Sequence, residues 1–233
     1  MTIISSCLLA QDQVFQKLIA EVDSAWPPRS PSGSELDQQC FTLVMRPDRA
    51  TAARLAGRLQ SMERLFGGPL YYGAENLHVT VFGIHEKLVS ELVVNHLHRF
   101  LAAHLCALQP LTMPIGGLSI VGNTVVMKAF DATGELLAFT RTARRELYDE
   151  IYGEGVDVDQ MIGLHSEIFW LSAARLSASP EQTEVDRKLL AYVQECFAES
   201  MGEAYFDEMK LCRTDQLFRP QNTEVLRRYT LGQ

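Results

Sequence analysis

The chain has 233 residues, of which 47% are hydrophobic, enough for one large domain or two small lobes around a packed core. Its 21 basic and 29 acidic residues leave a formal net charge of −8, which disfavours binding of long duplex nucleic acid through a broad basic face. A small nucleotide could still bind in a local pocket.

The cysteines and the N-terminus limit the cellular setting. The five cysteines are scattered and form no C-x-x-C pair, so neither a disulfide framework nor a zinc site is expected. No basic region precedes the short apolar stretch at the N-terminus, and no window approaches the roughly 18 apolar residues of a membrane span. We therefore expect a cytoplasmic protein with no membrane segment, and a monomer because no surplus apolar face is evident.

The N-terminal stretch has an amphipathic pattern. Apolar residues at helical spacing predict a helix, with Val14, Phe15, Leu18, Ile19 and Val22 on one side. A segment rich in proline and serine follows at 26–37 and is typical of a linker. The helix could pack on the body of the protein or bind a partner. We therefore divide the chain into an N-terminal helix and linker at 1–39 and a single two-lobed domain at 40–233.

Strand-like and helical patterns alternate from residue 40 onward. The first series predicts strands at 40–45 and 76–84, each followed by a helix, at 48–66 and 86–108. The second series predicts a hairpin at 111–130 with the turn signal VGNT, a helix at 134–152, a strand at 167–176, a helix near 185–197, and two strands at 204–215 and 223–232. The second series nearly repeats the order of the first, which indicates an α+β protein of two similar halves.

The predicted strand NLHVTVFGI contains two polar residues at the spacing of one strand face. Side chains alternate along a strand, so His78 and Thr80 would point to the same side. One interpretation is a histidine with satisfied hydrogen bonds beside a threonine that favours strands. The other is a pair of groups that lines a cleft.

With these features, the sequence resembles the LigT-like 2H phosphoesterases, which include bacterial 2′-5′ RNA ligases and cyclic phosphodiesterases. The resemblance covers about 41–232 and includes HVT at 78–80, GGLSIVGNTVVMKAF before a helix, and the closing MKLCRTD and TEVLRRYTLG. It implies two lobes with antiparallel-rich sheets, flanked by helices, around a central cleft. Each lobe would give one H-x-T/S motif to that cleft.

The second motif departs from the family pattern. It usually reads P-H-x-T-L-A-R, and the segment of matching character here is FWLSAARL, so Trp170 stands where the second histidine is expected. Ser172 takes the hydroxyl position and Arg175 the final arginine. His165 lies five residues before Trp170 and would point to the opposite face of a continuous strand, unless a bulge brought it into the cleft. His165 could equally be a loop histidine bonded to nearby backbone.

The resemblance also implies a chemistry. One histidine would act as general base on the attacking hydroxyl or water and the other as general acid on the leaving oxygen, with no metal or cofactor. Ser172 and Arg175 would donate hydrogen bonds to phosphate oxygens, although Arg175 could also be a surface arginine at a strand end. Tyr72, just before the first motif, would line the mouth of the cleft or pack between the lobes.

These patterns leave three hypotheses. In the first, the protein is a phosphodiesterase that acts on an RNA end or a small nucleotide, a 2′,3′-cyclic phosphate or a 2′-5′ linkage, through His78, Thr80 and His165. In the second, it is a catalytically impaired protein that binds nucleotides, with Trp170 stacked on a base. In the third, it is a scaffold whose N-terminal helix binds another protein.

Overall fold

The computed structural model describes residues 3–24, 39–67, 70–85, 91–149, 167–176 and 183–232. Its helices are α1 (Ile3–Ser24), α3 (Arg49–Phe66), α4 (Glu91–Leu105), α5 (Glu135–Ala143) and α7 (Thr183–Glu195), with a π-helical segment η2 (Arg144–Asp149) and a 3-10 turn η5 (Pro220–Asn222). Its strands are β1 (Gln39–Met45), β2 (Leu70–Tyr71), β3 (Val79–His85), β4 (Leu111–Val121), β5 (Thr124–Ala129), β6 (Phe169–Arg175), β7 (Ser200–Phe206), β8 (Glu208–Asp215) and β9 (Glu224–Thr230).

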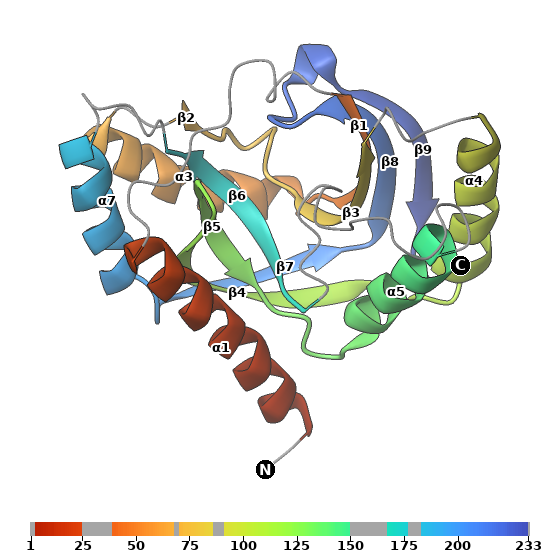
Figure 1. Cartoon of the computed structure of the whole chain (residues 1–233), viewed down its shortest axis with the longest axis horizontal. Helices are drawn as coiled ribbons and strands as arrows, with labels where there is room; N and C mark the ends of the chain where they lie inside the picture. The colour runs from red at the N-terminus through yellow and green to blue at the C-terminus, as the bar shows by residue number, and fades with distance from the viewer. Residues whose placement is uncertain are drawn as a thin grey trace.

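The strands form one antiparallel sheet that divides into two lobes (Figure 1). The order is β7-β4-β5-β6-β3-β1-β8-β9, and β2 pairs with β6. The first lobe comprises β3, β1, β8 and β9, and the second comprises β7, β4, β5 and β6. The lobes meet where β3 pairs with β6 through Val79 and Leu171. The predicted α+β class with antiparallel strands is confirmed.

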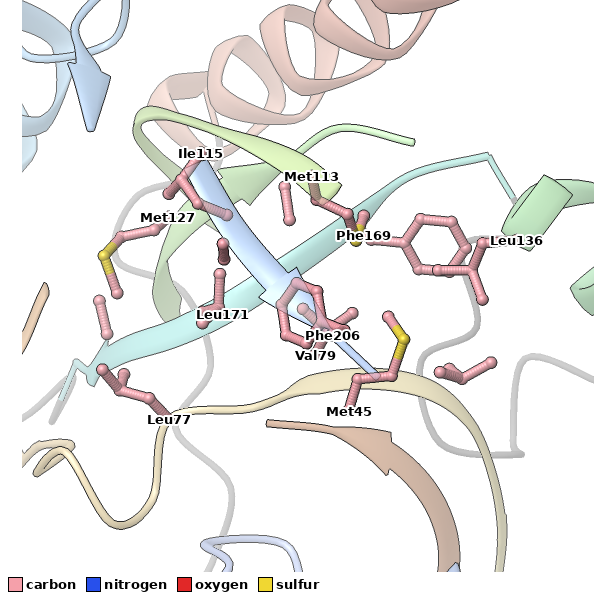
Figure 2. Close-up of a cluster of buried hydrophobic side chains, with 14 of the residues drawn as sticks. Met45, Leu77, Val79, Met113, Ile115, Met127, Leu136, Phe169, Leu171 and Phe206 are labelled. Carbon is pink, nitrogen blue, oxygen red and sulfur yellow. The ribbon is translucent and has the colours of Figure 1, made fainter. Parts of the chain in front are cut away.

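One hydrophobic core spans both lobes on one face of the sheet. Buried side chains of the helices, such as Leu55 of α3 and Leu101 of α4, join buried side chains of the strands. Figure 2 shows part of this cluster, with Val79 of β3, Leu171 of β6 and Phe206 of β7 among the labelled residues. Val79 and Leu171, which are paired at the centre of the sheet, are each 0% exposed and face this core.

The predicted hairpin at 111–130 is confirmed. Strands β4 and β5 pair up to Val121 and Thr124, and Gly122 has a φ of 58°, in the left-handed region that glycine adopts at little cost. The N-terminal helix is also confirmed as α1. Figure 1 shows α1 lying alongside β4 and β5, and contacts between α1 and β4 tie it to the second lobe.

Two boundaries differ from the sequence prediction. The segment 204–215 is divided at Asp207, because β7 pairs with β4 in the second lobe whereas β8 pairs with β1 in the first. His78 lies one residue before β3 rather than inside it. Within the described part of the chain, no helix is both long and apolar enough to cross a membrane.

Candidate functional site

The junction of β3 and β6 determines which side chains share the second face of the sheet. Val79 and Leu171 are paired and point into the core, so their neighbours along each strand point the other way. Continuing the antiparallel register puts Thr80 opposite Trp170 and His78 opposite Ser172. We call this side of the sheet, marked by these four side chains, the motif face.

His78 has a defined tautomer. Its Nδ1 lies 2.6 Å from the carbonyl oxygen of Asn76. A carbonyl oxygen only accepts hydrogen bonds, so Nδ1 carries the proton and donates it. In the neutral ring, Nε2 is therefore the unprotonated nitrogen, with a lone pair that can accept a proton.

The surroundings of His78 favour the neutral ring. The side chain is 5% exposed, and burial lowers its pKa from 6.5 to about 4. The hydrogen bond to Asn76 opposes this shift of the pKa, whereas the nearby positive charge of Arg46 adds to it. His78 is thus neutral at pH 7.

Phe218 covers His78. The centroids of the two rings lie 3.8 Å apart, and Phe218 is 5% exposed. Phe218 has a φ of 52°, unusual for a bulky residue. Asp215 holds this turn, because its carboxylate accepts hydrogen bonds from the backbone N–H of Leu217 and of Arg219 and from the side chains of Arg219 and Asn222. Sequence reasoning missed this contact; the available signal was the run DQLFRPQN, whose Asp, Pro and Asn are turn formers.

The structure brings Arg175 and Tyr72 together, and the two side chains form a hydrogen bond with each other. Nε of Arg175 donates a hydrogen bond of 2.9 Å to the Tyr72 hydroxyl, and Nη2 donates one of 3.2 Å to the carbonyl oxygen of Gln216. Tyr72 is 4% exposed and its backbone N–H donates to Ala173. These bonds connect the end of β6 to the turn that carries Phe218.

The remaining predicted site residues differ in what the structure says of them. Thr80, Trp170 and Ser172 are partly exposed on the motif face. His165 lies outside the described residues, so its distance from His78 stays a prediction. Among the residues that the structure describes, no group of three or more His, Cys, Asp or Glu side chains could hold a metal ion.

Three solved structures resemble this one. TT0787 of Thermus thermophilus matches with a TM-score of 0.59 and 18% identity, over 83% of this chain and 98% of that chain. A structure described as a phosphoesterase matches with a TM-score of 0.57 and 13% identity, over 84% of this chain and 99% of that chain. Escherichia coli LigT in complex with ATP matches with a TM-score of 0.52 and 14% identity, over 84% of this chain and 98% of that chain.

The chain has the LigT fold. No protein-family model matches the sequence, and no curated protein matches it either. At such low identities, the likeness to LigT concerns the fold.

Within this LigT fold, one further charged residue on the motif face was not anticipated. Lys128 of β5 pairs with Trp170 of β6 and therefore shares its face. Lys128 is 3% exposed, and its Nζ lies 2.6 Å from a carboxylate oxygen of Asp12 in α1. The signal in the sequence was a single lysine within the apolar run TVVMKAF. The motif face thus carries a buried cation on β5 in addition to the motif residues on β3 and β6.

Proposed function

We propose that the protein is a phosphodiesterase that acts on RNA ends or small nucleotides, on a 2′,3′-cyclic phosphate or a 2′-5′ linkage, with His78 as general base. The observation that carries this proposal is the hydrogen bond from Nδ1 of His78 to Asn76, which leaves Nε2 able to accept a proton. The LigT fold and the shared face of His78, Thr80 and Ser172 support it.

In this reaction, Nε2 of His78 takes a proton from water or from a substrate hydroxyl. The oxygen thus activated forms a bond to phosphorus while the bond from phosphorus to the leaving oxygen breaks. The hydroxyls of Thr80 and Ser172 donate hydrogen bonds to the phosphoryl oxygens. The leaving oxygen takes a proton from His165 or from water. We also propose that the protein is a cytoplasmic monomer and that the reaction needs no cofactor.

The test is hydrolysis of a 2′,3′-cyclic nucleotide and of a 2′-5′-linked oligoadenylate by the wild-type protein and by His78→Ala. We expect His78→Ala to lower kcat/KM by about 10²- to 10⁴-fold, the usual contribution of a positioned acid or base. His104→Ala is the matched control, because His104 is a partly exposed histidine on α4 that pairs with Glu146. Unchanged hydrolysis in His78→Ala would refute the role of His78.

His165→Ala belongs in the same assay. A loss similar to that of His78→Ala would identify His165 as the second proton-transfer group. Activity that His165→Ala leaves unchanged would assign the transfer to water.

A second candidate function rests on Trp170. The register puts this indole opposite Thr80, where the resemblance implies a second histidine. An indole stacks on a nucleobase but takes no part in proton transfer at neutral pH, so this function is nucleotide binding without turnover.

Tryptophan fluorescence separates the two functions. The chain has two tryptophans, Trp26 and Trp170, so a Trp26→Phe background isolates the signal of Trp170. We expect titration with 3′-AMP to quench this signal, and a further Trp170→Leu change to weaken binding about 5- to 150-fold, as expected for losing a stacked base. Quenching without hydrolysis of any tested substrate would favour the binding function, whereas no change in fluorescence would remove it.

A further inference from the structure

Helix α1 lies on the motif face. On β5, Val126 and Lys128 pair with Ser172 and Trp170 of β6, and paired residues of antiparallel strands share a face. Phe15 of α1 is 0% exposed and forms one cluster with Val126 and Ile168, against which Trp170 is packed. The helix therefore covers part of the face on which the proposed chemistry takes place.

Polar contacts hold α1 in place. The side-chain amide of Gln11 donates a 3.0 Å hydrogen bond to the carbonyl oxygen of Asp131 and accepts one of 3.0 Å from the backbone N–H of the same residue. Gln11 is 2% exposed. The backbone just after β5 is thus bound by α1 much as a neighbouring strand would bind it.

The ion pair of Asp12 with Lys128 is the charged part of this contact. The ammonium group lies 3.5 Å from the ring centroid of Phe197 and 5.6 Å from that of Phe130. Burial lowers the pKa of Lys128, and the hydrogen bond and charge of Asp12 oppose that shift. A cation in such a setting needs an anionic partner, and a phosphate group meets this need as well as a carboxylate does.

A groove leads to this ion pair. It has a volume of about 540 Å³ and is lined by residues of α1 and β4, by Lys128 of β5, and by residues at the start of β7 and just before it, including Asp12, Gly116 and Glu199. Glu199 pairs with Arg58. The helix itself precedes β1 in the sequence, and residues 25–38 separate the two, so release of α1 would break no strand pairing of the sheet.

We propose that Lys128 belongs to a phosphate-binding subsite of the motif face, and that α1 is an internal competitor whose Asp12 carboxylate occupies the position of a phosphate group. This inference rests on the proposed function in one respect, because it takes the ligand of the motif face to carry phosphate. Displacement of α1 then accompanies binding, and the N-terminal helix sets the affinity for the ligand.

The test is binding of inorganic pyrophosphate to the full-length protein, measured by calorimetry. We expect Asp12→Asn to bind pyrophosphate at least about tenfold more tightly than the wild-type protein, which is within the usual range of coupling between two ligands. The gain should vanish when Lys128→Gln is added. Glu21→Gln is the matched control, because it removes a charge from the same helix nine residues further along.

Hydrogen exchange of the wild-type protein gives a second readout that needs no variant. Saturating pyrophosphate should speed exchange of the backbone amides in 3–24, since ligand and helix compete. Slower or unchanged exchange would overturn the inference. Three results of the calorimetry would do the same: equal affinity of the wild-type protein and Asp12→Asn for pyrophosphate, a gain in affinity that persists in the double variant with Lys128→Gln, or no binding in any variant. Because pyrophosphate binding requires no turnover, these outcomes are independent of whether the protein hydrolyses nucleotides.

Discussion

At the scale of single residues, we expect the ring of Phe218 to control the solvation of His78. The ring of Phe218 is tilted by 37° to that of His78, with the centroids 3.8 Å apart, and burial is the largest cause of the lowered pKa of His78. A base that is neutral at pH 7 can accept a proton, but a covered base cannot reach a substrate. The turn that Asp215 holds therefore has to move for His78 to act. The positive φ of Phe218 is a strained conformation from which such a movement can start.

Phe218→Gly tests this control. Glycine removes the ring and adopts a positive φ without strain, so the turn can keep its backbone conformation. We expect the His78 ring to titrate near pH 4 in the wild-type protein and closer to 6.5 in Phe218→Gly, as followed by NMR. His98, whose ring contacts the Tyr229 hydroxyl on another part of the sheet, is the internal control and should not change. If the pKa of His78 is the same in Phe218→Gly as in the wild-type protein, side chains other than Phe218 bury the histidine.

The same substitution changes the dependence of stability on pH. The folded state holds the pKa of His78 below its unfolded value, so the unfolded chain binds more protons between pH 6.5 and about 4. Stability is then complete above pH 6.5 and falls as the pH decreases through this window, by about 1.4 kcal/mol for each unit of pKa difference. We therefore expect the free energy of unfolding, measured with urea between pH 4 and 7, to depend less steeply on pH in Phe218→Gly than in the wild-type protein.

At the scale of elements, α1 is an amphipathic helix whose apolar contact with the sheet centres on Phe15, in addition to the polar contacts of Gln11 and Asp12. Phe15 is 0% exposed and meets Phe130 edge-on, with ring centroids 6.2 Å apart, whereas Leu9 of the same helix is 48% exposed. The helix contacts the body through one face only. We therefore expect α1 to detach without unfolding of the sheet.

Phe15→Ala tests whether α1 is a separate unit. Truncation of a buried phenylalanine costs about 3 to 5 kcal/mol. We expect the free energy that protects the backbone amides of 3–24 from hydrogen exchange to fall by this amount, while the amides of β3 and β6 keep their protection. Leu9→Ala is the matched control and should change protection by less than about 0.5 kcal/mol. Equal loss of protection in α1 and in the central strands would show that the helix unfolds together with the body.

At the scale of the whole molecule, the sequence predicted what depends on local pattern. The alternation of strands and helices and the VGNT hairpin follow from periodicity and turn residues, whereas His78, predicted inside a strand, lies one residue before β3. The contacts that define the candidate site join distant segments. Asp12 and Lys128 are 116 residues apart in sequence, and Phe218 reaches His78 from the far end of the chain. Periodicity carries no information on such pairs, so docking of α1 on the motif face and the cover over His78 were not predicted.

The strand order has a consequence for synthesis of the chain on the ribosome. The second lobe is built from one continuous stretch, 111–206, whereas the first lobe joins β1 and β3 to β8 and β9 at the end of the chain. The edge of β1 that later pairs with β8 therefore stays unpaired while 46–207 is translated. At usual rates of synthesis this takes on the order of ten seconds or more. An unpaired strand edge invites pairing with other chains. The nascent first lobe is thus the part of this protein with most need of a chaperone.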